Sequence, residues 1–499
     1  MYTTDDLHRR QRLLVRIDVN APVEDGAVQS TRRFERHADS IAALLREDHG
    51  LALMAHQGRP GRDTFVTLEE HAEILSDLLG YPVEHVPSTH GEEALDAIED
   101  LGAGDVILLE NTRMSDDELP EEAPESKAGT EFVQALAPEL DAYVNDGYSV
   151  AHRSHASIVG FPEVMDAYAG PVMADEYEYN TSVERKEFDG QVTMVLGGTK
   201  AEDVIAAMDN LEEKVDRFLL GGVVGELFLR AKGYPVGHDL PDGPDLYDDN
   251  YAENEELIAD VLDRFGDRIE LPVDLAYEDM GEETDEAATE AESEDEAATE
   301  AESEDGEKAE ETDESEPEAE SEGEAGESED ESGADEGDDD ESGAGEGDDD
   351  ESGADEGDDD KIETDGGVED ENGGRSEHRV EEIDEKTVSY MDIGHETAER
   401  YVEVVEESEA VLVKGALGVF EDERFSHGTV EVLRAVADSD AFSVVGGGDT
   451  SRAVPMYGLD EDGFEHLSIA GGAYLKALTG EPLAGIEALE RAAERMDES

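Results

Sequence analysis

Nine residues near the end of the chain combine a buried-type strand with residue types that can hold phosphate groups. The run Phe442–Thr450 reads FSVVGGGDT, so four strand-type residues lead into Gly446, Gly447 and Gly448 before Asp449 and Thr450. A turn without side chains lets backbone N–H groups and a helix N-terminus approach an anion. Asp449 could then help to hold Mg²⁺, and Thr450 could donate to a terminal phosphate. A tight strand-to-helix turn with an N-cap is the simpler explanation of a single glycine triplet.

Paired glycines follow apolar residues at three other places in the sequence. These are Leu196-Gly197-Gly198-Thr199-Lys200, Leu220-Gly221-Gly222 and Ala470-Gly471-Gly472-Ala473. Because ligands of parallel sheets gather at strand ends, several such turns favour one shared anion pocket over a set of unrelated turns.

Basic and polar residues follow four predicted strands in the first half of the chain. The strands are Gln11–Val19, Leu51–Ala55, Asp105–Leu109 and Asp141–Asn145. The residues at their ends are Asp18 and Asn20, His56 and Arg59, Arg113, and His152 and Arg153. Each arginine alone would serve as an ion-pair partner among many acids. Together, four basic clusters at one edge of a parallel sheet predict an anion site.

Strand, loop and helix alternate in two series along the chain. The second series has strands at Val192–Leu196, Phe218–Leu220, Ile269–Val273, Ala410–Val413 and Phe442–Val445. Parallel sheets with crossover helices are the economical fold for this alternation. We therefore predict an α/β protein of two Rossmann-like three-layer α/β/α domains joined by a hinge helix. The predicted parts are a first domain at 1–168, a linking helix at 169–188, a second domain at 189–277 and 380–480, an acidic insert at 278–379, and a C-terminal segment at 481–499 that returns to the first domain.

Acidic residues dominate the whole chain. Lys and Arg number 35 against 139 Asp and Glu, which gives a net charge of −104. The stretch from Glu278 to Asp360 holds 45 acids and one Lys, so the remaining residues still carry a net charge of −60. Such self-repulsion is largely screened at ~1 M salt, where the Debye length is ~3 Å. We infer a halophilic, archaeal source, and we expect no nucleic-acid partner because phosphate backbones would be repelled.

Other features of the composition indicate the compartment. The chain has no Cys, which excludes disulfides and thiolate chemistry. Residues Met1–Arg12 are polar and lack the apolar core of a secretory signal, and no apolar run approaches the ~18 residues of a membrane span. We therefore expect a cytoplasmic protein without a membrane partner, a monomer with a homodimer left open.

The acidic insert at 278–379 is built from repeats. Asp285–Glu294 reads DEAATEAESE and recurs at Asp295–Glu304, and a ten-residue unit beginning ESGA occurs three times between Glu331 and Asp360. Such a segment buries too little apolar area to offset the entropy of ordering, so we expect it to be disordered. Hydration or ion binding, and replication slippage without any role, explain the repeats equally.

Nine motifs resemble those of the phosphoglycerate kinase family, in the family's order. In the first half they are RIDVN (Arg16–Asn20), Arg33-Phe34 followed by Ser40-Ile41, HQGRP (His56–Pro60), LLENTR (Leu108–Arg113) and VNDGYSVAHRSHAS (Val144–Ser157). In the second half they are LGGTK (Leu196–Lys200), GALGVFE (Gly415–Glu421), VVGGGDT (Val444–Thr450) and AGGAYLKALTG (Ala470–Gly480). The resemblance covers essentially the whole chain outside the insert. It implies reversible, Mg²⁺-dependent phosphoryl transfer between 1,3-bisphosphoglycerate and ADP, giving 3-phosphoglycerate and ATP, in glycolysis or gluconeogenesis.

The resemblance also implies a role for each matching position. The 3-phosphoglycerate contacts would be Asp18, Asn20, Arg33, His56, Arg59, Arg113 and Arg153. Arg33 would be the catalytic arginine and Lys200 the cation that follows the moving group. Gly471 and Gly472 would open a helix whose N–H groups stabilise the transferred oxygens. The nucleotide site would use Gly197, Gly221, Gly222, Glu421 at the ribose, Gly446, Gly447, Gly448, Thr450 at the terminal phosphate, and Asp449 at Mg²⁺.

Several residues depart from the family pattern, all in the nucleotide half. Val204 stands where a second lysine is common, Lys414 where asparagine is usual, and Ala416 where proline is usual. Val223 replaces a third glycine, and Ile469-Ala470 replaces Thr-Gly. Their effect on nucleotide contacts stays open at this stage.

The chemistry of phosphoryl transfer explains why these residue types are needed. The transferring group spreads negative charge over its oxygens, so catalysis is mainly positioning and electrostatic stabilisation. No general base is required, because the acyl-phosphate carboxylate and the nucleotide oxygen are already ionised. We therefore expect His56 and His152 to be hydrogen-bonding or structural residues. Two alternatives remain, a non-catalytic acidic interaction protein on a kinase scaffold and a kinase for another phosphorylated carboxylate.

Overall fold

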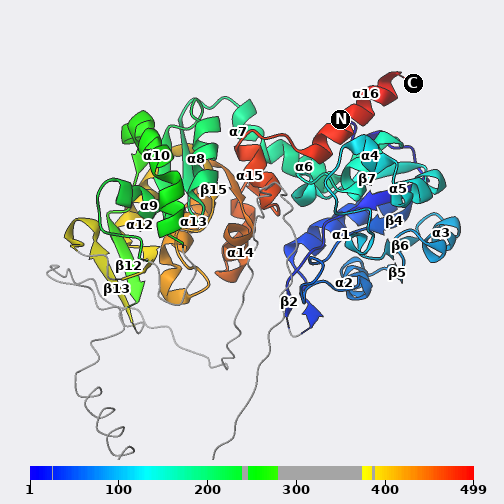
Figure 1. The fold of residues 1–499 in the computed structure, drawn as a ribbon, viewed down its shortest axis with the longest axis horizontal. Helices are drawn as coiled ribbons and strands as arrows, with labels where there is room; N and C mark the ends of the chain where they lie inside the picture. The colour runs from blue at the N-terminus through cyan, green and yellow to red at the C-terminus, as the bar shows by residue number, and fades with distance from the viewer. Residues whose placement is uncertain (25, 239–245, 279–373, 385–387, 499) are drawn as a thin grey trace, which may run out of the picture. The chain divides into compact units, whose positions relative to one another are not determined.

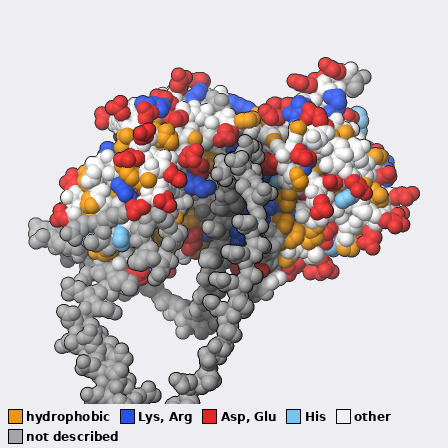
Figure 2. All heavy atoms as spheres, viewed as in Figure 1, with side chains coloured by type: hydrophobic (Ala, Val, Ile, Leu, Met, Phe, Trp, Pro, Cys, Tyr) orange, Lys and Arg blue, Asp and Glu red, His pale blue; other side chains and the backbone are white. Residues whose placement is uncertain are grey.

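The computed structural model describes residues 1–24, 26–238, 246–278, 374–384 and 388–498, which belong to one compact unit. Most of the predicted insert, from 279 to 373, lies outside the described residues. On the face of the molecule shown in Figure 2, Asp and Glu side chains are spread widely over the described residues, whereas Lys and Arg are fewer. The acidic character predicted for the part outside the insert is therefore a property of its surface.

The first half of the chain folds around a sheet of six parallel strands in the order β5-β6-β4-β1-β7-β8 (Figure 1). The strands are β1 (Arg12–Arg16), β4 (Gly50–Met54), β5 (Glu84–Val86), β6 (Val106–Leu109), β7 (Ala142–Asn145) and β8 (Ala167–Ala169). The helices of this half are α1 (Arg32–Leu45), α2 (Glu69–Leu79), α3 (Glu92–Glu99), α4 (Pro124–Ala128) and α5 (Glu131–Leu136). A short hairpin joins β2 (Val23–Glu24) and β3 (Ala27–Val28).

Alternation along β1 explains the helical layers on both faces of this sheet. Leu13 and Val15 belong to the core cluster that contains Phe34 and Ile41 of α1. Leu14 belongs to the cluster on the opposite face, because successive strand residues point to opposite sides. The strand is shorter than the predicted Gln11–Val19. It ends at Arg16 because the Asp18 amide leaves the sheet and donates to His37 Nε2 at 3.1 Å.

The second half has its own sheet of six parallel strands, in the order β11-β10-β9-β15-β16-β17. The strands are β9 (Gln191–Leu196), β10 (Arg217–Leu220), β11 (Ile269–Glu270), β15 (Ser408–Lys414), β16 (Phe442–Gly446) and β17 (His466–Leu467). The helices are α8 (Ala201–Asn210), α9 (Gly222–Ala231), α10 (Asp248–Phe265), α12 (His395–Glu406), α13 (His427–Asp438), α14 (Gly448–Met456) and α15 (Gly472–Leu478). The predicted fold class, α/β with two parallel sheets, is confirmed.

A third, antiparallel sheet corrects two sequence predictions. It has the order β13 (Arg375–Arg379), β12 (Asp274–Glu278) and β14 (Tyr390–Ile393). The predicted strand Ile269–Val273 is wrong beyond Glu270, because Pro272 has no N–H to donate and the chain starts a new strand at Asp274. The acidic segment is shorter than predicted at its C-terminal end, since Arg375–Arg379 pair with β12.

Helices also connect the two halves. Where the linking helix was predicted, the chain forms α6 (Pro171–Asn180) and α7 (Ser182–Arg185). The last helix, α16 (Ala484–Glu498), packs against β8, and Tyr2 donates to Asp497 Oδ1 at 2.6 Å. In the part of the chain described above, no helix is both long enough and apolar enough to cross a membrane.

Short helical turns complete the chain. They are η1 (Thr4–Asp6), η2 (Thr112–Met114), η3 (Ala137–Glu139), η4 (Tyr148–Val150), the π-helical η5 (Ala156–Gly160), η6 (Phe161–Glu163), η7 (Gly266–Arg268), η8 (Val380–Glu382), η9 (Glu423–Phe425) and η10 (Glu461–Gly463). Among them, η2 carries Arg113, so this turn places one of the predicted anion ligands at the carboxyl end of β6.

Candidate active site

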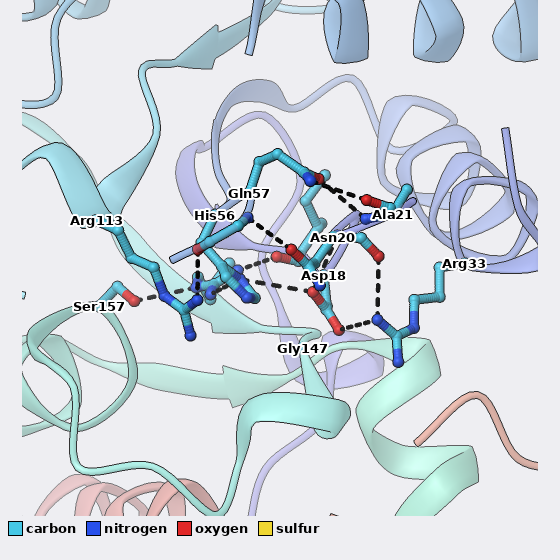
Figure 3. Close-up of polar contacts among 12 residues, drawn as sticks. Asp18, Asn20, Ala21, Arg33, His56, Gln57, Arg113, Gly147 and Ser157 are labelled. Carbon is cyan, nitrogen blue, oxygen red and sulfur yellow. Dashed lines mark hydrogen bonds and ion pairs between the residues drawn. The ribbon is translucent and has the colours of Figure 1, made fainter. Parts of the chain in front are cut away.

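Arg33 reaches from the first turn of α1 to the carboxyl end of β1, as Figure 3 shows. Its Nη1 donates to the carbonyl oxygen of Asn20 at 3.0 Å and lies 3.6 Å from Oδ2 of Asp18. The Asn20 side chain accepts from Gly58 N at 2.8 Å, which ties the β1 and β4 loops together. Within the described residues Nη2 of Arg33 makes no hydrogen bond, so its two N–H groups are available to an anion.

Asp18 is a buried carboxylate held in its ionised form by arginines. Burial alone would raise its pKa, but the guanidinium groups of Arg33 and Arg16 outweigh that effect and hold the pKa well below its usual range. Arg16 is fully buried, and its Nη2 donates to His56 Nδ1 at 3.0 Å. Because a guanidinium only donates, His56 Nδ1 accepts, and the neutral ring carries its proton on Nε2. Burial, with Arg113 next in importance, lowers the pKa of His56 far enough to keep the ring neutral.

Further arginines gather beside this group. Arg113 donates from Nη1 to the carbonyl oxygen of Gly58 at 2.6 Å. Burial, then the positive charges of Arg16 and Arg153, lowers the pKa of Arg113 to about 10. Burial, then the positive charges of Arg113, Arg16 and Arg153, lowers the pKa of His155 to about 3, so this ring is neutral. The positive charges of Arg16 and Arg153 thus contribute, after burial, to the lowered pKa values of Arg113 and His155, so several cationic side chains lie close together here, as an anion site requires.

Sequence reasoning missed the buried polar residues that orient these arginines. The Arg16 Nε donates to Ser157 Oγ at 3.0 Å, and Ser157 donates to the buried carboxylate of Glu118 at 2.6 Å. His37 lies 3.0 Å from Asp146 and accepts the Asp18 amide through its other nitrogen. Arg16 and Ser157 lie inside motifs already singled out, so membership of a motif was the available signal. Nothing in the sequence pattern pointed to Glu118, which is brought in by the fold.

Glycine turns at the ends of β9, β10 and β15 pack backbone against backbone. Gly198 N donates to Ala416 O at 3.0 Å, and Gly222 N donates to Leu417 O at 3.0 Å. A Cβ on Gly197 would collide with the Ala416 carbonyl, so this approach requires glycine. The structure therefore places the predicted Gly197, Gly221 and Gly222 close together, at the carboxyl ends of the neighbouring strands β9 and β10.

The triple-glycine turn follows β16 and starts α14. Gly447 has φ +104°, and a Cβ on Gly448 would meet nothing within 4 Å, so the turn borders open space. Thr450 is buried, and its Oγ1 accepts from Gly415 N at 3.0 Å, which links this turn to the end of β15. The side chain of Asp449 lies outside the described part of the structure, whereas its backbone belongs to α14.

The two halves touch beside α15. Arg33 Nε donates to the carbonyl oxygen of Ile469 at 3.2 Å, just before the Gly471-Gly472 pair. A Cβ on Gly472 would lie 3.1 Å from Nε2 of His152, so the imidazole ring covers the start of α15. Burial, then Arg153 and Lys476, lowers the pKa of His152 to about 3. The cationic group of the first sheet and a glycine turn of the second therefore share one region.

Glu176 of α6 anchors the segment that leads to this region. Its buried carboxylate accepts from Ser468 Oγ at 2.6 Å and from Ile469 N at 3.1 Å, and it lies 3.3 Å from His466 Nε2. Burial would raise the pKa of Glu176, but His466 and these hydrogen bonds lower it. Helix α6 is thus hydrogen-bonded directly to the segment whose Ile469 carbonyl oxygen accepts from Arg33.

The remaining predicted residues differ in exposure and in their partners. Lys200 is exposed at the N-cap of α8, and Arg59 and Arg153 are half-buried in loops of the first half. Glu421 forms an ion pair with Arg452, both half-exposed, so its carboxylate already has a partner. Val204 is fully buried in α8, and Lys414 lies 3.9 Å from Asp203.

Two parallel sheets, a cationic group at the end of one and glycine turns at the ends of the other, define the class of two-domain α/β kinases of small phosphorylated substrates. The family model described as phosphoglycerate kinase matches residues 4–312 and 353–481. The chain is 52% identical to the phosphoglycerate kinase of Halorubrum lacusprofundi over 99% of this chain and 98% of that protein. It is 51% identical to that of Haloarcula marismortui over 98% of this chain and 99% of that protein.

A solved structure supports the same relationship. The crystal structure of phosphoglycerate kinase from Pyrococcus horikoshii covers 99% of this chain and 100% of its own, with a TM-score of 0.75 and 27% identity. The chain therefore belongs to the phosphoglycerate kinase family. The resemblance stated from the motifs is confirmed, and the haloarchaeal relatives agree with the halophilic source inferred from charge.

Proposed function

We propose that the chain catalyses reversible, Mg²⁺-dependent phosphoryl transfer between 1,3-bisphosphoglycerate and ADP in the cytoplasm. The observation that carries this proposal is the Arg33–Ile469 contact, because it joins the cationic group to a glycine turn of the other sheet. An enzyme of this kind needs an anionic acceptor on one side and a nucleotide phosphate on the other, close enough for direct transfer. Family membership supports the same reaction and gives no support to a non-catalytic role.

The first sheet would bind 3-phosphoglycerate, which carries a carboxylate and a phosphate. The proposed ligands are Asp18, Asn20, Arg33, His56, Arg59, Arg113 and Arg153. Arginine forks give bidentate contacts to both kinds of anion. A neutral His56 that carries its proton on Nε2 would donate to an oxygen without adding charge. Asp18 would accept a substrate hydroxyl, since its carboxylate stays ionised.

The second sheet would bind the nucleotide. Gly197, Gly221 and Gly222 would form the floor of the base site, with Glu421 at the ribose. Gly446, Gly447, Gly448 and Thr450 would contact phosphates together with Lys200. Since Glu421 is paired with Arg452, ribose binding would require this exposed pair to open, at a cost of roughly 0–1 kcal/mol.

Asp449 is the proposed magnesium ligand. Mg²⁺ keeps several waters and is usually held by one or two carboxylates together with substrate phosphates, so a single Asp beside the open turn at Gly448 fits the ion. When bound, the ion would neutralise charge on the nucleotide phosphates and so favour transfer.

The protein's own contribution would be positioning and charge stabilisation. Nη2 of Arg33 would donate to the oxygens of the phosphoryl group in flight, while Gly471 and Gly472 would offer N–H groups from the start of α15. We propose that 1–168 with 481–499 forms the acceptor domain, that 189–278 with 375–480 forms the nucleotide domain, and that motion about residues 169–188 closes them and excludes water.

A coupled assay in molar KCl tests this function. The purified chain should form ATP from 1,3-bisphosphoglycerate and Mg-ADP, and the reverse reaction should consume ATP only when 3-phosphoglycerate is present. A parallel reaction with other phosphorylated carboxylates defines the acceptor. Absence of ATP formation by the folded protein across a range of KCl concentrations would refute the proposal.

A further inference from the structure

Lys414 ends β15 between two glycine turns of the second sheet. Its carbonyl oxygen accepts from Gly197 N at 2.9 Å, and the following amide, Gly415 N, donates to Thr450 Oγ1 at 3.0 Å. Its Cα pairs with Leu196 on one side and Gly446 on the other. The backbone therefore fixes this lysine at the point where the turns after β9 and β16 begin.

The Lys414 side chain extends over the face of the sheet that α8 covers. Alternate residues of a strand share a face, and Leu412 belongs to the core cluster that contains Val204 of α8. In agreement, Lys414 Nζ lies 3.9 Å from Oδ2 of Asp203, in the first turn of that helix. Lys200 is the N-cap of the same helix, so two lysines stand at its N-terminal end.

These two lysines differ in exposure to solvent. Lys200 is exposed, whereas 15% of the Lys414 side chain is accessible. Added salt screens exposed charges strongly and buried ones much less, and at ~1 M the Debye length is ~3 Å. The Lys414 Nζ–Asp203 Oδ2 separation of 3.9 Å exceeds hydrogen-bond length, so the attraction between these two groups is electrostatic.

We propose that Lys414 binds a phosphate of the nucleotide and supplies the salt-resistant part of nucleotide affinity. This inference rests on the proposed function, since it takes the glycine turns as the nucleoside di- and triphosphate site. Lys200 supplies a second part that weakens as KCl rises. Val204 is buried and uncharged, so at this end of α8 the less exposed of the two lysines, Lys414, comes from the strand end.

Calorimetric titration with Mg-ADP at about 1 M and about 3 M KCl tests the assignment. Lys414→Gln should weaken Mg-ADP binding about tenfold or more at both concentrations and leave adenosine binding unchanged. Lys200→Gln should lose affinity mainly at the lower concentration. Lys414→Arg should restore most of the loss. Lys214→Gln is the matched control, because Lys214 lies before the first residue of β10, at the amino ends of the strands, and pairs with Glu187 at 3.0 Å.

Two results would overturn the assignment. One is Mg-ADP affinity in Lys414→Gln equal to that of the wild type, and the other is an equal loss for ADP and adenosine, which indicates a structural role. If Lys414→Gln does not fold by circular dichroism, Asp203→Asn replaces it: losing the competing carboxylate should tighten Mg-ADP binding, and unchanged or weaker binding overturns the inference. A wild-type chain that binds Mg-ADP but forms no ATP refutes the proposed function instead, so the two failures are distinguishable.

Discussion

Replacing Arg33 by alanine should lower kcat by about 10³–10⁵-fold, the range typical of an arginine that stabilises a transferring phosphoryl group. Coulomb's law leads to the same magnitude. A guanidinium ~3 Å from one unit of negative charge interacts by ~5 kcal/mol at an effective dielectric of ~20. A 10³–10⁵-fold change corresponds to roughly 4–7 kcal/mol of barrier. The Nη2 group, which makes no hydrogen bond within the described residues, is the one placed to provide that interaction.

The fold should survive the same substitution. Arg33→Ala removes hydrogen bonds to the carbonyl oxygens of Asn20 and Ile469, at about 0.5–1.5 kcal/mol each, while the charge of Arg16 still stabilises the ionised Asp18. Melting followed by circular dichroism in molar KCl should therefore show a small decrease in Tm. Arg36→Ala is the matched control. Arg36 lies on the same helix with a similar exposed fraction and pairs with Asp175 at 3.5 Å, outside the candidate site.

Steady-state kinetics in both directions separates the effects. Arg33→Ala should lower kcat with a smaller change in the KM for Mg-ADP, while Arg36→Ala should keep both constants. Arg33→Lys, which keeps the charge but loses the fork, should recover only part of the rate. If Arg33→Ala retains kcat within tenfold of the wild type, Arg33 does not stabilise the transferring group and the reasoning is refuted.

Three other measurements examine the fold and its charge. Activity and Tm should both rise from low to molar KCl, because salt screens the acidic surface, and a flat dependence would contradict the halophilic inference. Gly446→Ala should destabilise the protein by about 1–3 kcal/mol, because the added Cβ would press into the Tyr474 ring. Gly448→Ala is the control and should keep the wild-type Tm, because its Cβ would meet nothing within 4 Å. Equal Tm values for the two variants would disprove the clash. The lowered pKa of Glu176 means that its ionised form adds stability that is present at neutral pH and lost as pH falls through that pKa. Below about pH 5, Tm should therefore drop more for the wild type than for Glu176→Gln. Parallel curves of Tm against pH would refute this.

The sequence predicted the parts of the site that lie on continuous runs. Strand ends and glycine turns are local patterns, so Arg113 and the Gly446–Gly448 turn could be placed at sheet edges before any coordinates. The fold class followed from the alternation of strands and helices, and the family was identified because nine motifs occur in one order over the whole chain outside the insert. The individual roles of the site residues stay predictions.

Other parts of the site depend on contacts between distant segments. Glu118 and Arg16 are joined through Ser157, and no periodicity links these three positions. Ile269–Val273 was predicted as one strand because its apolar content does not show where strand pairing stops. The strand β11 ends at Glu270, before Pro272, and a new strand starts at Asp274. Arg375–Arg379 is polar, so only its pairing with β12 revealed a strand.

The β12–β13 pairing has a consequence for how the acidic segment can change over evolutionary time. Glu278 and Arg375 face each other across the two strands, so the ends of the intervening chain are held together by the fold itself. The entropy of closing a loop grows only with the logarithm of its length, by about 0.6 kcal/mol per doubling. Gaining or losing one ten-residue unit would then alter stability by roughly 0.1 kcal/mol. As far as loop closure is concerned, the number of ten-residue units can therefore change with almost no cost to the β12–β13 pairing.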